Sequence, residues 1–257
     1  MPGQALPVIR LPSASRLELL DYCRHFPKLV WDQTPPGEAA LNGTFTHKLI
    51  ELDLRGEQPA GGIASEGVDV EKCLKIFARW KAWWGTYAGD RLWFPEVVFL
   101  YNVRTGAVRA AGADWQEEGR PRGADEIPAI VDALTVADGK GYAIDWKTGK
   151  LGGAPAAAVN PQLALAAVCI SKFFGVSEVD VSLGWLRQIK DPMLDTATLN
   201  ALDLYEWEQR NRENCDAIPA AEPNPGQWCW KCPGKSNCPE VGRKVPEGVE
   251  GIDFPPW

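Results

Sequence analysis

The stretch from Ile127 to Gly149 constrains the fold of this chain most strongly, because it predicts two β-strands joined by a short turn. Residues 127–136 are rich in β-forming side chains, and residues 137–141 form a five-residue turn that contains Asp-Gly. Residues 142–147 then form the return strand. The sequence therefore predicts a β-hairpin at the centre of the chain.

The hairpin brings charged side chains together. Asp132 and Asp145 each lie four residues from the predicted turn, so they face one another across the two strands. Because side chains alternate along a strand, Asp145 and Lys147 project from one face and Trp146 from the other. Two carboxylates can bind a hard divalent cation, and a nearby ammonium can orient water or offset phosphate charge.

An exposed hairpin with charged flanks is the alternative interpretation of these residues. Asp145, however, lies inside the apolar strand YAIDW. An unpaired charge is costly to bury in such a strand. This placement favours a functional site over a solvated hairpin.

Length and charge limit the class of protein. A chain of 257 residues is long enough for one large domain with a buried core, and its 45% apolar and 24% charged content is ordinary for a globular protein. The net charge of −7 gives no global attraction for nucleic acid. Any contact with DNA must therefore use a local basic surface.

The expected compartment is the cytoplasm. The opening residues lack the apolar core of a signal peptide, and the most apolar tract, Leu163 to Ile170, is too short to cross a bilayer. Seven cysteines, an odd number, then indicate a reducing environment in which clustered cysteines bind metal more often than they form disulfides. We expect no membrane partner.

Two helices are predicted near the N-terminus. The first spans residues 15–23, with Ser15 and Glu18 spaced as a capping box. The second begins near Thr44 and places His47 in its first turn, where the positive helix end favours a neutral imidazole that can bind metal. A lone histidine is more often structural, so both interpretations of His47 stand on the local sequence.

A third helix and a second hairpin follow. Residues 69–87 carry aromatic side chains at helical spacing beside a basic face, which indicates a core stripe whose lysines can contact phosphates. Residues 92–102 and 107–113 predict two strands joined near residues 105–106. Glu96 interrupts the first strand, and alternation leaves open whether it faces solvent or the hairpin acids.

The chain after the hairpin predicts a parallel crossover. Asn160 can cap a helix that runs to Phe174, which places Gln162 in its first turn, within reach of a metal or a DNA phosphate. Residues 179–187 predict the next strand, so the sheet is mixed and covered by helices. A further helix is predicted from about residue 198 to residue 215.

Three cysteines near the C-terminus indicate a metal centre. Cys229 and Cys232 form a C-x-x-C pair, and Cys238 follows closely. Four thiolates suit either zinc or a four-iron cluster. The fourth ligand can be Cys23, which is distant in sequence, or Cys215, which is nearby.

The motif Asp145-Trp146-Lys147-Thr148-Gly149, thirteen residues after Asp132, resembles the PD-(D/E)xK nuclease signature in its RecB-like form. Two further matches are the G-x-x-x-H run that ends at His47 and the Q-L run that begins at Gln162, although Ala166 stands where the family usually has tyrosine. The resemblance implies a restriction-endonuclease-like α/β fold.

The resemblance also implies roles for these residues. His47, Asp132, Asp145 and the main-chain carbonyl of Trp146 would hold Mg²⁺ or Mn²⁺, and Lys147 would position water or stabilise the transition state. Two further residues, Glu96 and Gln162, would support the site.

The RecB-like and CRISPR-adaptation types of this family carry one early and three late cysteines around a [4Fe-4S] cluster, a pattern that maps onto Cys23, Cys229, Cys232 and Cys238. We accordingly expect one nuclease domain, with its core at about residues 40–190. The cluster region would comprise residues 13–27 and 215–240, followed by a tail at residues 241–257.

The implied function is a metal-dependent DNA exonuclease that acts on single strands or DNA ends. Repair, recombination, phage and CRISPR-type DNA processing are the settings of such enzymes, and a helicase is a possible partner. A different class of function is a DNA-binding or assembly module whose iron-sulfur or zinc centre organises partners without cleavage.

Overall fold

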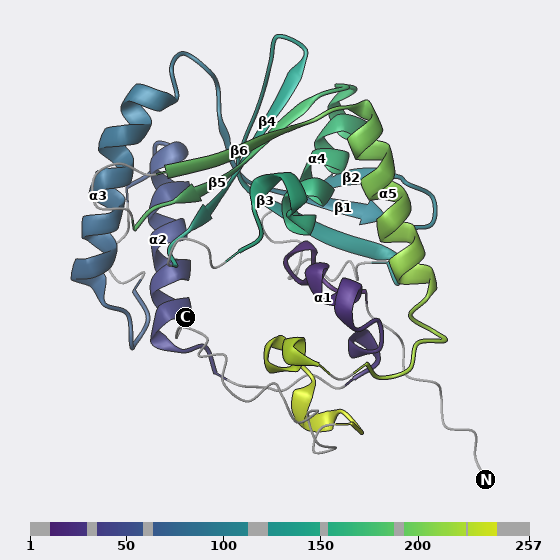
Figure 1. Ribbon diagram of the computed structural model, residues 1–257. Coiled ribbons are helices and arrows are strands. Elements are labelled where there is room, and N and C mark those ends of the chain that lie inside the picture. The colour runs from purple at the N-terminus through teal and green to yellow at the C-terminus, as the bar shows by residue number, and fades with distance from the viewer. Residues whose placement is uncertain are drawn as a thin grey trace.

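The computed structural model describes residues 11–29, 35–58, 64–112, 123–149, 154–187, 193–224 and 226–240. Its centre is a mixed six-stranded sheet in the order β2-β1-β3-β4-β5-β6, with helices on both faces (Figure 1). The strands are β1 (Phe94–Asn102), β2 (Val108–Ala111), β3 (Glu126–Ala137), β4 (Lys140–Lys147), β5 (Val179–Trp185) and β6 (Met193–Leu199). The predicted mixed α/β fold is confirmed.

Among the described strands, one neighbouring pair is parallel. β4 and β5 pair in parallel and are joined through α4 (Pro161–Phe174), whereas the other neighbours pair antiparallel. The predicted strand, helix, strand crossover is therefore confirmed. α4 and α5 (Ala201–Asp216) lie on one side of the sheet, and α2 (Glu38–Leu54) and α3 (Val70–Tyr87) lie on the other (Figure 1).

The central hairpin has a tighter turn than the predicted five-residue one. Ala137 pairs with Lys140, so only Asp138 and Gly139 connect β3 to β4. Both residues have positive φ, 53° and 75°, which a two-residue turn of type I′ requires. Asp-Gly suits this conformation because aspartate tolerates the left-handed region and glycine adopts it without steric penalty.

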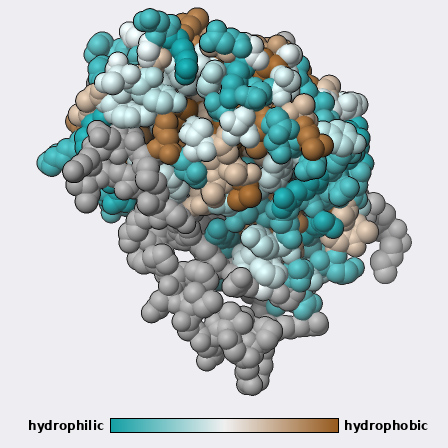
Figure 2. Space-filling model, turned by 45° about the horizontal axis from the view of Figure 1, so that its top comes forward, coloured by the Kyte–Doolittle hydropathy of each residue, from teal (hydrophilic) through white to brown (hydrophobic). Residues whose placement is uncertain are grey.

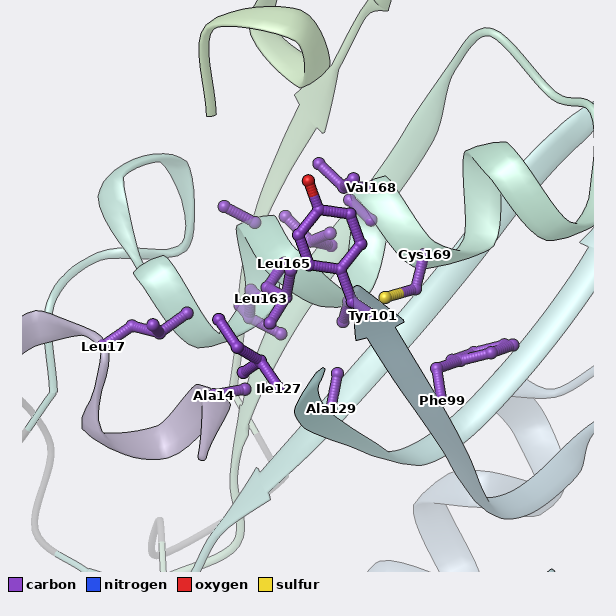
Figure 3. Packing of buried hydrophobic residues seen from close by; sticks show 14 of the residues in the cluster. Ala14, Leu17, Phe99, Tyr101, Ile127, Ala129, Leu163, Leu165, Val168 and Cys169 are labelled. Atoms are coloured by element: carbon purple, nitrogen blue, oxygen red, sulfur yellow. The ribbon is translucent and has the colours of Figure 1, made fainter. Parts of the chain in front are cut away.

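The larger core lies between the sheet and α4. Asn160 caps α4 by accepting hydrogen bonds from the backbone N–H groups of Gln162 and Leu163, at 3.0 and 3.2 Å. Pro161 begins the helix, and Gly175 ends it at φ 70°. α4 side chains pack against those of β1, β3 and the N-terminal segment (Figure 3). Burial on this helix extends around much of its circumference, which explains its nearly uniform apolar sequence.

The first predicted helix is wrong in detail. Residues Ala14–Arg16 form a 3₁₀ turn, η1, and the helix proper, α1, spans Glu18–Tyr22. Ser15 therefore lies inside the turn, with its hydroxyl 3.0 Å from that of Ser13, and caps nothing. The cause is burial, because Ala14 and Leu17 pack against α4 and so fix the path of this segment (Figure 3).

The second predicted helix begins earlier than residue 44. α2 starts at Glu38, directly after Gly37, because residues 38–41 are good helix formers with no breaker among them. His47 consequently lies in the middle of α2. The prediction that the positive helix end favours a neutral imidazole at His47 is therefore wrong.

α3 and its aromatic side chains agree with the sequence pattern. Asp69 caps the helix by accepting a hydrogen bond from the Lys72 N–H at 3.0 Å. The ring of Trp80 stacks between Phe77 and Trp84, and Trp146 of β4 meets Trp80 edge-on at 6.1 Å. The aromatic stripe is thus core, as predicted.

One strand escaped the sequence analysis. β6 forms the edge of the sheet, and the helix predicted from about residue 198 begins at Ala201 after a capping box of Asn200 and Asp203. The short run MLDTATL is more polar than the other strands, so it carries a weak apolar pattern. Pairing with β5 decides its conformation.

The face shown in Figure 2 is mixed in hydropathy. Hydrophobic side chains appear on one face as small areas separated by hydrophilic ones (Figure 2). Within the described ranges, every helix is too short or too polar to span a bilayer.

Gly184 of β5 lies under the indole of Trp146, where an added Cβ would stand 2.3 Å from the ring. Gly184→Ala should therefore lower the free energy of unfolding by about 2–3 kcal/mol in urea titrations, because Trp146 has no space to retreat. The control Gly85→Ala, at an exposed helical position with open space around it, should raise stability by about 0.5–1 kcal/mol. Equal effects of the two substitutions would contradict this packing.

Candidate active site and cysteine cavity

The predicted acidic pair lies where β3 and β4 separate. The antiparallel register pairs Ala133 with Ile144, so Asp132 and Asp145 occupy the next positions on the two strands. The Trp146 N–H donates a hydrogen bond of 2.7 Å to Asp132 Oδ2. The predicted juxtaposition of the two aspartates is thus present even though the turn is shorter.

The strands are distorted at this level. Val131 and Leu134 pack into the core beneath α4, while Ala133 packs into the core on the opposite face, so the alternation of β3 shifts by one residue at Asp132. Glu96, at the matching position of β1, has a φ of 47°. This conformation is uncommon for a glutamate. Such local strain often accompanies a functional site.

α2 brings His47 to the acidic pair. Gly43 lies so close to the segment after β4 that an added Cβ would be 3.0 Å from the Thr148 hydroxyl oxygen. One helical turn later, His47 Nδ1 lies 3.3 Å from Asp132 Oδ1. The glycine of the G-x-x-x-H run therefore permits α2 to approach the segment after β4, and this approach brings the histidine to Asp132.

Two other residues predicted for the site, Lys147 and Gln162, contact the Asp145 carboxylate. Its Oδ1 accepts a hydrogen bond from Gln162 Nε2 at 2.6 Å, and its Oδ2 lies 2.6 Å from Lys147 Nζ. Lys147 Nζ also donates to Gln162 Oε1 at 3.4 Å. Gln162 reaches the site because Asn160 and Pro161 begin α4 just before it. The aspartate itself is only 6% exposed.

The two carboxyl groups have opposite electrostatic environments. Burial alone would raise the pKa of Asp132, but the adjacent His47 and the Trp146 N–H outweigh it and hold that pKa below its usual value. Burial and the charge of Asp132 raise the pKa of Asp145, although Lys147 opposes them. Burial lowers the pKa of His47, yet Asp132 raises it more strongly.

This donor set suits a divalent cation. It contains the buried carboxylate of Asp145, the carboxylate of Asp132, which is 17% exposed, and an imidazole, and hard cations prefer oxygen ligands. Asp145 Oδ2 is buried, and among the described residues it has no hydrogen bond of regular geometry, although Lys147 lies close. The described part of the chain holds no group of three or more potential ligands already arranged around a metal position.

Glu96 does lie near this site, and it does not face open solvent. It forms a hydrogen bond with Glu51 of α2, which is buried and pairs with Lys48 and Arg55 at 2.8 Å each. Burial and the charge of Glu51 raise the pKa of Glu96 to about 7. The sequence analysis missed Glu51, although its position four residues after His47 on one helix face is a usable signal.

The four cysteines of the predicted cluster line one small cavity. Cys23, Cys229, Cys232 and Cys238 surround about 20 Å³ together with apolar side chains. Burial raises the pKa of the Cys232 thiol, and the three neighbouring thiols raise it further.

The three remaining cysteines lie elsewhere. Cys215 is buried in α5, where burial raises its pKa to about 12, and it does not line the cavity. Cys73 and Cys169 are fully buried in the core.

The cysteine cavity joins distant parts of the chain. The ring of Tyr22 stacks on Trp228 with centroids 5.3 Å apart, and the Asn224 side chain donates a 2.7 Å hydrogen bond to the Tyr22 carbonyl. His25 Nδ1 lies 2.9 Å from the Ala221 carbonyl oxygen. The late segment consequently lies below α1 (Figure 1). Nothing is described of residues 241–257, so the predicted tail lies outside the described residues.

Glu96→Gln should alter the pH dependence of stability. The folded protein holds a proton on Glu96 between its ordinary pKa of 4.5 and about 7, so this group stabilises the fold below that range and loses its contribution as pH rises through it. The glutamine keeps a donor toward Glu51. The free energy of unfolding of the variant should therefore gain about 1–2 kcal/mol relative to wild type between about pH 4.5 and pH 8.

Urea titrations at a series of pH values measure this difference. The control Glu57→Gln, at an exposed position beyond α2, should follow the wild-type profile. Parallel profiles for wild type and Glu96→Gln would show that Glu96 does not carry the proton.

Comparison with known proteins identifies the family. Residues 13–239 match the model of the PD-(D/E)XK nuclease superfamily. A search of curated proteins gives no match. A solved structure named SSO0001 is 15% identical, covers 66% of this chain and 74% of its own, and has a TM-score of 0.34.

A protein from Eubacterium rectale named "Putative exonuclease" is 11% identical, covers 88% of this chain and 87% of its own, and has a TM-score of 0.49. Both TM-scores lie below 0.5, and the family is assigned from the sequence match alone. Because that match spans most of the chain and includes the acidic hairpin, the protein belongs to the PD-(D/E)XK nuclease superfamily.

Proposed function

We propose that this protein is a metal-dependent DNA nuclease, and that it acts as an exonuclease on single strands or DNA ends. The observation that carries the proposal is the meeting of Asp132, Asp145, Lys147 and Gln162 at the separated ends of β3 and β4. Membership of a nuclease superfamily supports the hydrolytic chemistry.

His47, Asp132, Asp145 and the main-chain carbonyl of Trp146 would hold Mg²⁺ or Mn²⁺. When bound, such a cation supplies a Lewis acid for the phosphate and lowers the pKa of a bound water. The fit rests on the two neighbouring carboxylates and on Asp145 Oδ2, which is buried and has no hydrogen bond of regular geometry among the described residues.

Lys147 has the position of a catalytic cation. Asp145 and Gln162 hold its ammonium at 2.6 and 3.4 Å, so its charge is fixed beside the carboxylates before substrate arrives. A fixed ammonium can orient the attacking water and stabilise charge on the phosphate oxygens. In the hydrolysis, the water oxygen bonds to phosphorus, one phosphorus–oxygen ester bond breaks, and the leaving oxygen takes a proton.

Gln162 and Glu96 support the site in different ways. Gln162 fixes the orientation of Asp145 through a 2.6 Å hydrogen bond. Glu96 ties β1 to α2 through Glu51, which keeps the helix that carries His47 next to the strand ends.

The cysteine cavity would hold a [4Fe-4S] cluster, with zinc as the alternative. Four thiols that converge on one cavity support metal binding, and the placement of Cys23 there supports it as the fourth ligand in preference to Cys215. A bound centre would fasten α1 to the late segment that carries Cys229, Cys232 and Cys238.

Cleavage of end-labelled DNA in Mg²⁺ or Mn²⁺ tests the activity. Asp145→Ala should abolish cleavage, and Lys147→Ala should slow it by about 10²–10³-fold, because a preorganised charge is lost. The matched control Lys140→Ala, on the same strand but paired with Glu178 and Asp180, should cleave like wild type. If wild type binds DNA and leaves every substrate intact, the protein is a binding module.

Metal and sulfide analysis of protein purified without oxygen tests the cysteine centre. Wild type should contain iron and acid-labile sulfide, and Cys23→Ala should lose most of both. Cys215→Ala should keep them, although removal of a buried thiol lowers stability. Zinc without sulfide would support the zinc alternative, and loss of metal in Cys215→Ala alone would reverse the assignment of the fourth ligand.

A further inference from the structure

A cavity of about 290 Å³ opens directly beside the catalytic groups. It starts at Lys147 and Gln162 and extends between the N-terminal segment and the start of α4, where Ser15, Glu18, Pro155 and Trp185 line it. Lys147 and Gln162 contact Asp145 on one side and this cavity on the other. A group attached to the reacting phosphate can therefore enter the cavity.

The walls suit a nucleoside better than a phosphate. Pro155 offers an apolar surface and Trp185, only 3% exposed, closes the inner wall, while the hydroxyl of Ser15 and the carboxylate of Glu18 offer hydrogen-bonding groups at the edge. Of the described residues that line the cavity, Lys147 alone is cationic. Glu18 lies 3.6 Å from Lys231, but its carboxylate still opposes a second phosphate. A flat base with its sugar fits this combination.

A basic groove lies on the other side of the strand ends. It encloses about 510 Å³ beside α3 and is lined by more basic than acidic side chains, among them Lys72, Lys75, Arg79 and Arg187. Such a surface attracts a phosphate backbone even though the whole protein is acidic.

The cavity and the groove lie on either side of the end of β5. Trp185 lines the cavity, and Arg187, two residues later, lines the groove. Between them, the Leu186 N–H donates a 3.0 Å hydrogen bond to the Lys147 carbonyl. The two hollows therefore flank the strand end that carries the catalytic lysine.

We propose that the cavity binds the terminal nucleoside of a DNA single strand, with its phosphate at Lys147, and that the backbone continues along the basic groove. This inference rests on the proposed nuclease function and names the substrate of the same site. The nucleotide must be unpaired to enter the cavity, because a paired base would bring the second strand against the walls. A further nucleotide beyond it would place a phosphate beside Glu18. The site is thus built for strand ends.

Fluorescence of 2-aminopurine tests the placement without catalysis. In the Asp145→Asn variant, short oligothymidylates carry the probe at the 5′ end, the 3′ end or an internal position. Contact with the cavity walls should quench the probe at one end at least threefold more than at the internal position. Equal quenching at all three positions would overturn the inference.

A second comparison uses a variant whose larger side chain fills part of the cavity. Ser15 is exposed at the cavity wall, so Ser15→Met should be tolerated by the fold and should remove more than half of the terminal quenching. Ala158→Met, at an exposed position nearby that does not line the cavity, should leave the quenching unchanged. Unchanged quenching in Ser15→Met would also overturn the inference.

Cleavage separates this inference from the proposed function. Wild type in Mn²⁺ should degrade linear single-stranded DNA at least tenfold faster than a circular form of the same sequence. Equal rates would overturn the terminal subsite and the exonuclease mode, whereas the metal-dependent nuclease activity would stand. If neither form is cleaved, the nuclease proposal fails, and the fluorescence comparison still decides whether the cavity binds a strand end.

Discussion

The placement of Asp132 and Asp145 at facing positions of β3 and β4 is the constraint on which the rest of the site depends. Two carboxylates placed side by side and largely shielded from water repel one another, so each needs a cationic or hydrogen-bonding partner that stabilises its charge. The partners of Asp132 are His47 and the Trp146 N–H, and those of Asp145 are Lys147 and Gln162. Every one of these groups comes from an element whose position is fixed by packing elsewhere.

That packing works from both faces of the sheet. On one face, the apolar α4 lies across the central strands, and its capped N-terminus delivers Gln162. On the other, the indole of Trp146 fills the space above Gly184 and meets the aromatic rings of α3. Since Trp146 lies between Asp145 and Lys147 in sequence, its burial fixes the direction in which both charged side chains point.

The cysteine cavity adds a connection that the sheet alone does not provide. The N-terminal segment lines the proposed nucleoside cavity through Ser15 and packs against Trp228 through Tyr22. A metal centre at Cys23 would therefore hold one wall of the proposed nucleoside cavity. α1 lines both hollows, through Leu19 in the cysteine cavity and through Glu18 in the proposed nucleoside cavity.

The sequence by itself determined the hairpin, the facing aspartates, the crossover to β5 and the buried aromatic stripe, because each depends on local turn chemistry or on periodicity. Tertiary structure decided what lies far apart along the chain. The approach of Gly43 to Thr148 brings His47 to the acids, and the pairing of Glu51 with Glu96 arises only where α2 meets β1. Such contacts depend on how elements pack, and no local pattern encodes the distance between them.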